Sequence, residues 1–266
     1  MPEPKEDEIP TLEITEVTKW LSDEECPSVS LLIPCYLRNK FLPLILVNLL
    51  HMDYPKDKME VVILQDGPED LFRPGEESFF RSKIGAINMK YLYEKNIRRS
   101  IGEKRNKLVK MASHKICLMV DSDDIYLPSY VRYSVSALKE HRVGITSSSS
   151  MVFIYPDKDY LITGIRCGFK RQGHEAVMCF TKKHFKSMGG FISKGKEGSM
   201  GEGSKMIDFN EKNMVNLDVT KMMICVCHSG DEGNTIPKDR FSDAKFDATL
   251  NELPHLEVLK SIFNQN

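Results

Sequence analysis

The chain has 266 residues, of which 41% are hydrophobic and 28% are charged, values that are ordinary for a soluble globular protein. Its 37 basic and 38 acidic residues leave a net charge of −1, so the overall balance does not indicate nucleic acid as the main partner. The length fits one large α/β domain or two small ones.

The seven cysteines indicate a reducing environment, because their number is odd and several lie inside apolar runs. Cys225 and Cys227, next to His228, lack the spacing and the second ligand pair of a structural zinc site. Residues 1–10 lack the basic start and apolar middle of a signal peptide, and the longest apolar stretch, residues 41–50, is too short to span a membrane. We therefore expect a soluble, cytoplasmic protein without a transmembrane segment.

The first half of the chain alternates apolar strands with helices, after an expected flexible leader over residues 1–27. Strands are predicted at residues 30–34, 59–64, 91–93 and 115–120, and helices at residues 38–51, 101–112 and 128–140. Ser100 and Glu103 have the spacing of a capping box at the start of the second helix. This alternation predicts an α/β fold with a mostly parallel central sheet and helices on both faces. Strands of such a sheet present functional residues at their carboxyl ends.

The second half is less regular and is predicted to form a smaller, β-containing region. Residues 151–155 and 221–227 are typical of strands, and the glycine-rich residues 191–204 predict a mobile loop. We expect one core domain over residues 28–240, with halves at 28–127 and 128–240, followed by a C-terminal helical segment over residues 241–266.

Three carboxylates fall within four residues at Asp121, Asp123 and Asp124, directly after the apolar run 116–120. They repel one another unless a cation or basic side chains lie among them. Carboxylates suit hard cations such as Mg²⁺ and Mn²⁺, which also bind diphosphate oxygens. A solvated turn that caps the next helix is the alternative, but the position at a strand end favours a cation site.

Five basic residues lie just upstream within eleven positions, at Lys95, Arg98, Arg99, Lys104 and Arg105. Lys104 and Arg105 fall near the first turn of a predicted helix, where the helix dipole also favours a phosphate group. An exposed basic face is the competing interpretation, and it applies mainly to Arg98 and Arg99.

Three more positions carry candidate chemistry. Asp66 ends a predicted strand, where it either forms a turn with the following glycine or accepts hydrogen bonds from a ligand. His228 follows an apolar strand and offers the neutral imidazole nitrogen that metals bind. Glu202 lies in the glycine-rich loop, where a carboxylate can serve as a general base for a hydroxyl group, with Asp208 as a rival.

In this order, the motifs resemble those of the family 2 glycosyltransferases with the GT-A fold, over roughly residues 28–235. The ordered set is more specific than any single member, and it comprises Ile33-Pro34-Cys35-Tyr36, Asp66-Gly67, Gly102-x-x-Arg105-Asn106, Leu118 to Asp124, Glu202 and His228. The ending His228 to Thr235 is similar to a form found in large-DNA-virus and related members of the family.

The resemblance implies that residues 28–127 bind a nucleotide sugar and that residues 128–240 bind the acceptor. It also implies a role for each donor-binding residue. Pro34, Tyr36 and Arg38 would line the pocket of the nucleotide base, and Asp66 would form a hydrogen bond with the base. Lys104 and Arg105 would lie beside the ribose and diphosphate, and Asp121 with Ser122 near the ribose or donor sugar.

For the chemical step, the resemblance implies that Asp123 binds Mn²⁺ or Mg²⁺, that His228 completes the metal or diphosphate site, and that Glu202 or Asp208 is the base. The family often has paired acids at the base position, whereas Gly203 follows Glu202 here. The implied reaction is the metal-dependent transfer of a hexose, by default from a UDP-sugar, to a hydroxyl of a glycan or other acceptor, with inversion.

Two other classes compete with this interpretation. A sugar-phosphate nucleotidyltransferase also holds a nucleotide and a metal at strand ends, but the glycine-rich loop with Lys or Arg after the first strand is missing. A non-catalytic nucleotide- or carbohydrate-binding module has no need of Glu202 or His228. A P-loop enzyme is disfavoured because the sequence contains no Gly-x4-Gly-Lys-Ser/Thr motif.

Overall fold

The computed structural model describes residues 13–166, 173–195, 201–207, 214–228 and 254–264. A seven-stranded sheet forms its centre, in the order β10-β6-β9-β4-β1-β2-β3. The strands are β1 (Val29–Tyr36), β2 (Met59–Gly67), β3 (Asn88–Lys95), β4 (Ile116–Met119), β6 (Ile145–Ser147), β9 (Cys179–Thr181) and β10 (Met214–Asn216). All neighbouring pairs are parallel except those that β9 makes with β4 and β6.

Alternating apolar side chains explain why this sheet is buried on both faces. Leu31 and Ile33 of β1 enter one hydrophobic core, whereas Leu32 between them enters a second core. Val61 and Val62 of β2 are divided between the two cores in the same way. Since successive side chains of a strand point to opposite faces, a continuous apolar run requires helices on both sides.

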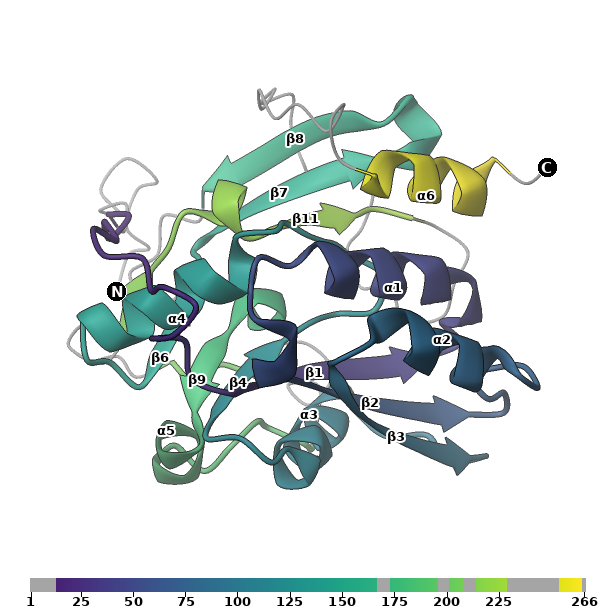
Figure 1. The fold of residues 1–266 in the computed structure, drawn as a ribbon, viewed down its shortest axis with the longest axis horizontal. Helices are drawn as coiled ribbons and strands as arrows, with labels where there is room; N and C mark the ends of the chain where they lie inside the picture. The colour runs from purple at the N-terminus through teal and green to yellow at the C-terminus, as the bar shows by residue number, and fades with distance from the viewer. Residues whose placement is uncertain (1–12, 167–172, 196–200, 208–213, 229–253, 265–266) are drawn as a thin grey trace, which may run out of the picture.

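The helices supply these two layers (Figure 1). Helices α1 (Leu42–His51), α2 (Glu76–Ile84) and α4 (Tyr130–Glu140) contribute buried residues to the first core. Helix α3 (Ile101–Met111) packs on the opposite face, and its Leu108 and Val109 lie in the second core. The short α5 (Lys182–Ser187) lies on the same side as α3. The predicted fold, with a mostly parallel sheet and helices on both faces, is confirmed.

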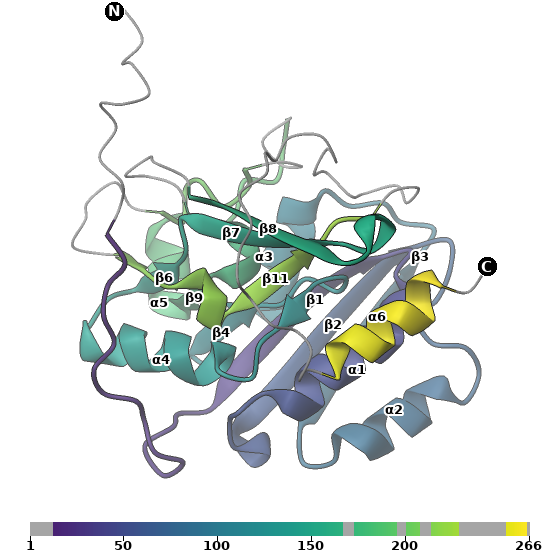
Figure 2. The same ribbon diagram turned by 90° about the horizontal axis from the view of Figure 1, so that it is seen from above.

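A second, four-stranded sheet has the order β5-β11-β7-β8 and covers the first core (Figure 2). Its strands are β5 (Ile125–Tyr126), β7 (Ser150–Tyr155), β8 (Leu161–Arg166) and β11 (Met223–Val226). Phe153 and Ile154 of β7 and Ile224 of β11 are buried in the first core. This sheet corresponds to the smaller β-containing region that the sequence predicts.

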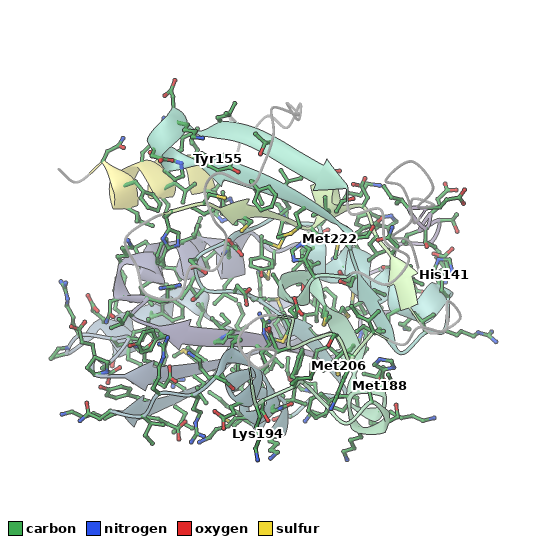
Figure 3. The ribbon with its side chains drawn as sticks, turned by 180° about the vertical axis from the view of Figure 1, so that it is seen from behind. His141, Tyr155, Met188, Lys194, Met206 and Met222 are labelled. Carbon is green, nitrogen blue, oxygen red and sulfur yellow. The ribbon has the colours of Figure 1, made fainter. Side chains whose placement is uncertain are left out.

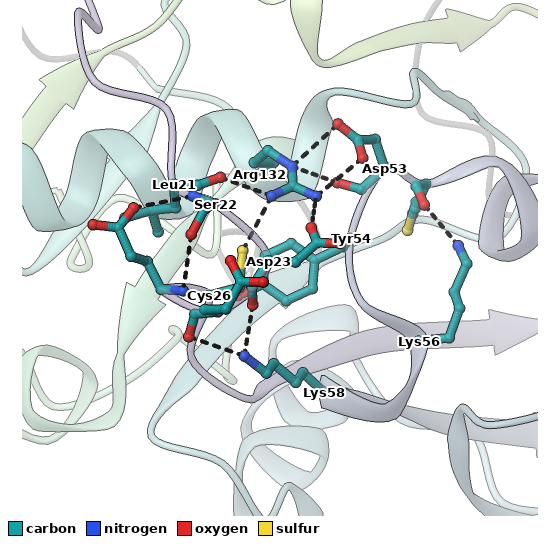
Figure 4. A network of polar contacts seen from close by, with 12 residues as sticks. Leu21, Ser22, Asp23, Cys26, Asp53, Tyr54, Lys56, Lys58 and Arg132 are labelled. Carbon is teal, nitrogen blue, oxygen red and sulfur yellow. Dashed lines mark hydrogen bonds and ion pairs between the residues drawn. The ribbon is translucent and has the colours of Figure 1, made fainter.

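Arg132 of α4 ties the chain ahead of β1 to the domain (Figure 4). Its guanidinium donates to the carbonyl oxygen of Leu21 at 2.7 Å and pairs with Asp23 at 2.6 Å and with Asp53 at 3.0 Å. Leu21 and Cys26 are buried. Residues 13–27, which fall within the predicted leader, therefore pack along α4 in this structure.

Helix α6 (His255–Phe263) is the last described element and packs on α1. In the reverse view, Tyr155 marks the second sheet, while Lys194 and Met206 lie on the other side of the molecule, near α3 (Figure 3). No helix among the described residues is both long enough and apolar enough to cross a membrane. The six cysteines in the described ranges are free and buried.

Candidate active site

The order of the strands places a topological switch point between β1 and β4. These two strands are adjacent and parallel, but the chain leaves β1 toward β2 and arrives at β4 from β3, so the connections run in opposite directions. Ligands of open α/β sheets bind at such a switch point, outside the carboxyl ends of the strands. The residues that follow β1 and β4 are Leu37 and Arg38 on one side and Val120 to Asp124 on the other.

At the end of β1, Tyr36 lies over Gly67 of the neighbouring β2. A Cβ atom at Gly67 would lie 2.8 Å from the Tyr36 ring, and the φ angle of Gly67 is +107°, so glycine is needed at this position for both reasons. The guanidinium carbon of Arg98 lies 3.2 Å from the centre of the Tyr36 ring. Tyr36 therefore carries a stacked cation at the site where the resemblance implies a nucleotide base.

Asp66 is fully buried at the end of β2, and both of its carboxylate oxygens accept hydrogen bonds. Lys104 donates to one oxygen at 2.8 Å, and the backbone N–H of Arg99 donates to the other at 2.7 Å. Lys104 also donates to the carbonyl oxygen of Cys35 at 3.1 Å. Burial lowers the pKa of Lys104, although the carboxylate opposes this effect. In this structure, the Asp66–Lys104 pair thus joins β1, β2 and α3.

Asp123 forms a first charged group with Arg38 and His228, which we call the Asp123 cluster. One carboxylate oxygen of Asp123 lies 3.0 Å from Arg38 and 3.1 Å from Nε2 of His228. Burial acts to raise the pKa of Asp123, but the His228 hydrogen bond and the Arg38 charge outweigh it and lower that pKa. The His228 ring packs between Phe41 and Phe263, with ring centres 4.9 and 6.0 Å away.

Arg105 of α3 is the centre of a second charged group, the Arg105 cluster, which comprises Arg105, Asp121, Glu202 and Glu175. Its guanidinium lies 2.8 Å from Glu202 and 3.2 Å from Asp121. Burial opposes the charge of Arg105, but Asp121, Glu202 and Glu175 together raise its pKa. The pKa of Asp121 is raised by burial and by Asp123 and Glu202, against the opposing effect of Arg105.

The rest of the acidic segment is held in place by buried hydrogen bonds. Ser122 donates to the carbonyl oxygen of Pro34 at 3.2 Å, which links the segment to β1. Asp124 accepts from the backbone N–H of Val226 at 2.9 Å, which links it to β11. The backbone N–H of Asp121 donates to the hydroxyl of Tyr126 at 2.7 Å. Each residue of the segment thus faces a different part of the fold.

Gly102 allows the loop that carries Glu202 to pack against the first turn of α3. A Cβ atom at Gly102 would lie 1.8 Å from the carbonyl oxygen of Ile192, a distance that no side chain tolerates. The backbone N–H of Ile192 donates to the carbonyl oxygen of Glu202 at 2.8 Å. Asn106 of α3 exchanges two hydrogen bonds with the backbone of Phe191, at 2.8 and 2.9 Å. These contacts place Glu202 beside Arg105.

The Asp123 cluster offers a donor set that fits a divalent cation. Asp123 supplies a carboxylate oxygen and His228 an imidazole nitrogen, and this mixed pair suits Mn²⁺ better than Mg²⁺, which prefers oxygen ligands. Among the described residues, no group of three or more His, Cys, Asp or Glu side chains is arranged to hold a metal ion. A cation bound here would therefore take its other ligands from diphosphate oxygens and water, and Arg38 would have to release the Asp123 oxygen.

The structure gathers most of the predicted site residues at this one edge of the sheet. The Asp123 cluster, the Arg105 cluster and the Lys104–Asp66 pair all include residues at or directly after the carboxyl ends of β1, β2 or β4. Asp208 and most of the predicted virus-like ending, residues 229–235, lie outside the described residues. Sequence reasoning missed Glu175, because nothing near it in the sequence indicates that it meets Glu202.

The family's sequence pattern, described as "Glycosyl transferase family 2", matches residues 30–194, which is more than half of the chain. The chain belongs to this family. Among curated relatives, the poly(ribitol-phosphate) beta-N-acetylglucosaminyltransferase TarS of Staphylococcus aureus is 29% identical over 112 residues, 42% of this chain and 19% of TarS. The UDP-forming cellulose synthase catalytic subunit of Pseudomonas fluorescens is 27% identical over 140 residues, 50% of this chain and 18% of that protein.

Solved structures show the same fold at low sequence identity. A mannosyltransferase from Pyrobaculum calidifontis, in complex with GDP-Man and Mn²⁺, has a TM-score of 0.58 at 19% identity and covers 84% of this chain and 62% of its own. TarS residues 1–349 in complex with UDP-GlcNAc give a TM-score of 0.59 at 16% identity, over 79% and 61% of the two chains. This family 2 chain thus spans less than a fifth of its curated relatives and under two thirds of these solved chains. The predicted family and the GT-A fold are confirmed.

Proposed function

We propose that this family 2 chain is a metal-dependent glycosyltransferase that moves a hexose from a nucleoside diphosphate sugar to a hydroxyl of a glycan or other acceptor. The observation that carries the proposal is the meeting of Arg38, Asp123 and His228 between the carboxyl ends of β1 and β4. Two cationic or metal-binding side chains around one carboxylate suit a diphosphate that arrives with a cation. A UDP-sugar is the proposed donor, and inversion is the proposed outcome.

The donor-binding residues form a path from the base pocket to the diphosphate. Tyr36 presents an aromatic ring for the base, once Arg98 moves off its face, and Asp66 with Lys104 fixes the end of β2 beneath it. Arg105 and Asp121 form an ion pair, at which the ribose and the donor sugar are expected. The similar structures support a nucleotide-sugar donor, since TarS is solved with UDP-GlcNAc and the mannosyltransferase with GDP-Man and Mn²⁺.

In the proposed step, the acceptor oxygen attacks the anomeric carbon while the bond to the diphosphate breaks. A bound Mn²⁺ or Mg²⁺ supplies positive charge that offsets the charge developing on the departing diphosphate. Arg38 is free to pair with a phosphate oxygen when it leaves Asp123, because its guanidinium binds phosphate as well as carboxylate. A carboxylate near Arg105 accepts the acceptor's proton, and Glu202 is the residue that the sequence predicts for this role.

The test is a panel of nucleotide sugars offered with Mn²⁺ and simple glycan acceptors, scored by nucleotide release and by thermal shift. We expect at least one UDP-sugar to raise the melting temperature and to release UDP. Pyrophosphate release from a nucleoside triphosphate and a sugar phosphate would instead establish a nucleotidyltransferase. Donor binding without any slow hydrolysis or transfer would establish a non-catalytic binding module.

A further inference from the structure

Glu175 occupies the space beside Gly203 that a side chain at position 203 would fill. A Cβ atom at Gly203 would lie 2.5 Å from Cγ of Glu175 and 2.9 Å from its carboxylate oxygen. The backbone N–H of Gly203 donates to the same Glu175 carboxylate at 2.9 Å. The residue after Glu202 thus lacks a side chain, and a carboxylate from another part of the chain takes the vacant place.

Glu202 itself forms a buried ion pair with Arg105. Its side chain is only 6% exposed and lies 2.8 Å from Nε of Arg105, whose own side chain is 5% exposed. Glu175, by contrast, is half-buried and accepts a hydrogen bond from the Gly203 backbone. Protonation of Glu202 would remove the charge that neutralises Arg105, whereas protonation of Glu175 leaves the buried Glu202–Arg105 pair intact.

The charge around Arg105 also favours proton uptake by Glu175. One guanidinium faces three carboxylates, those of Asp121, Glu202 and Glu175, so negative charge is in excess. Burial and the charge of Glu202 raise the pKa of Glu175, while Arg105 opposes them. The neighbouring His174 stays neutral, because burial lowers its pKa to about 4. A carboxylate with a raised pKa is a better proton acceptor near neutral pH than an ordinary one.

Tyr126 connects the backbone next to Glu175 to the backbone of Asp121. Glu175 begins the short 3₁₀ helix Glu175–Val177, and the carbonyl oxygen of Ala176 in this helix accepts a hydrogen bond from Tyr126 at 2.8 Å. The same hydroxyl accepts the N–H of Asp121 at 2.7 Å. Glu175 and Asp121 are therefore fixed relative to each other through one fully buried side chain.

We propose that Glu175, rather than Glu202, accepts the proton of the acceptor hydroxyl, and that Glu202 serves to hold Arg105. This inference rests on the proposed function. The O–H bond of the acceptor breaks and its proton moves to a Glu175 carboxylate oxygen. The acceptor oxygen forms a bond to the anomeric carbon, and the electron pair of the broken sugar–phosphate bond leaves with the nucleoside diphosphate. Glu175 then returns its proton to water.

The first test compares Glu175→Gln with the wild-type chain, using the donor identified for it. We expect kcat to fall about 100-fold or more, the range for loss of a general base. The dissociation constant for UDP with Mn²⁺ should stay within twofold, because Glu175 contacts Gly203 and is not part of the Asp123 cluster. A Glu175→Gln variant that folds and keeps a kcat near that of the wild type would overturn the proposal.

The second test moves the carboxylate to the neighbouring position. Glu175→Ala removes two of the three atoms nearest to a Cβ at position 203, and the third, Cε of Met178 at 2.8 Å, is the end of a flexible side chain. Glu175→Ala/Gly203→Asp should therefore regain at least tenfold in kcat over Glu175→Ala. The matched control, Glu175→Ala/Gly203→Ala, fills the same space without a carboxylate and should regain nothing. Equal recovery in the two double variants, or recovery in neither, would contradict the proposal and would assign Glu175 a packing role.

These outcomes are distinct from a failure of the proposed function. If the wild-type chain neither binds nor turns over any nucleotide sugar, the proposed function is wrong and the base assignment falls with it. If the wild-type chain transfers sugar and the Glu175 variants transfer it equally well, only the base assignment is wrong. Thermal melting of each variant identifies loss of folding, and the pair of double variants then decides the question by comparison with Glu175→Ala.

Discussion

The two charged clusters on either side of Ser122 have opposite compositions of acidic and basic side chains. In the Asp123 cluster, one carboxylate is shared by a guanidinium and an imidazole. In the Arg105 cluster, one guanidinium is shared by three carboxylates. The pKa of Asp123 is accordingly lowered, whereas that of Glu175 is raised. A carboxylate whose pKa is lowered stays charged and suits a cation that arrives with a diphosphate, whereas a carboxylate whose pKa is raised suits a proton.

A single acidic segment can therefore take part in both cation binding and proton transfer when its residues face different parts of the fold. Asp121 and Asp123 are two positions apart, and each is paired with a different arginine. Arg38 comes from the turn after β1, where Leu37 has a φ angle of +52°, and Arg105 comes from α3. The roles differ because the two partners come from different elements.

The largest expected effect is on the Asp123 cluster. Asp123→Asn keeps the size of the side chain but removes the charge that a cation and His228 require. We expect turnover to fall roughly 10³-fold, comparable to the loss of a key electrostatic group in other enzymes, and EDTA to do the same to the wild-type chain. Nucleotide release measures both effects. Asp57→Asn on the exposed surface is the control, and full activity of Asp123→Asn or in EDTA would remove the metal from the mechanism.

The Arg105 cluster should depend on the shape of its cation as well as on its charge. Arg105→Lys keeps the positive charge but cannot contact Asp121 and Glu202 together through one planar group. We expect transfer to fall about 100-fold, the scale of a small misplacement of reacting groups. The dissociation constant for UDP with Mn²⁺ should rise less than this, since lysine keeps a positive charge near the proposed ribose position and Asp123 and His228 are untouched. An equal loss of UDP binding would show that the two clusters do not act separately.

Gly102→Ala tests how the Arg105 cluster is assembled. Alanine is favoured over glycine in a helix by about 1 kcal/mol, but its Cβ would overlap the carbonyl oxygen of Ile192. Overpacking typically costs about 1–3 kcal/mol, so we expect a net loss of stability and roughly tenfold slower transfer as Glu202 shifts. Chemical unfolding and kcat provide the measurements. Lys110→Ala, at an exposed position on the same helix, is the control. A Gly102→Ala chain as active and stable as that control would contradict the close packing of Gly102 against Ile192.

Glu60 lies far from both clusters and should affect stability alone. It is fully buried and accepts hydrogen bonds from Ser30 at 2.6 Å and from Ser113 at 2.7 and 2.8 Å, with Lys90 at 2.9 Å. Burial opposes ionisation, but these partners outweigh it and hold the pKa of Glu60 at about 2, against an ordinary value of 4.5.

Because the folded-state pKa of Glu60 is depressed, its contribution to stability is present above pH 4.5 and is lost as the pH falls toward 2. We expect Glu60→Gln to cost about 1–3 kcal/mol at pH 7 and much less near pH 3, with kcat unchanged at pH 7. Urea unfolding at the two pH values measures this difference. An equal loss of unfolding free energy at pH 7 and pH 3 would show that Glu60 stabilises the fold by packing and not by its charge.

The regular half of the fold was predictable because its signals are local. The strand at β1, the capping box at Ser100 and the acidic segment after β4 are each readable within a few residues, and the structure confirms all three elements. The site residues Arg38, Asp66, Arg105 and Asp121 follow from these elements, since parallel strands bring their carboxyl ends together. Their assignment to base, ribose or sugar stays a prediction.

The features that the sequence did not predict depend on contacts between residues far apart in the chain. β9 pairs antiparallel with β4 and β6, and nothing in its three residues indicates that direction. Arg98 is exposed, in agreement with its interpretation as part of a basic face, but nothing in the sequence indicates that it stacks on Tyr36. Glu175 has no motif around it, and its position beside Glu202 depends on the absence of a side chain at Gly203. Such pairings become visible only in the folded structure.

The most direct test of the division between the two clusters is a calorimetric titration of UDP, with and without Mn²⁺, into the wild-type chain, Asp123→Asn and Glu175→Gln. The account predicts Mn²⁺-dependent binding to the wild-type chain, loss of that dependence in Asp123→Asn, and unchanged binding to Glu175→Gln even though its transfer activity is lost. Equal loss of UDP binding in both variants, or Mn²⁺-dependent binding that survives in Asp123→Asn, would contradict it.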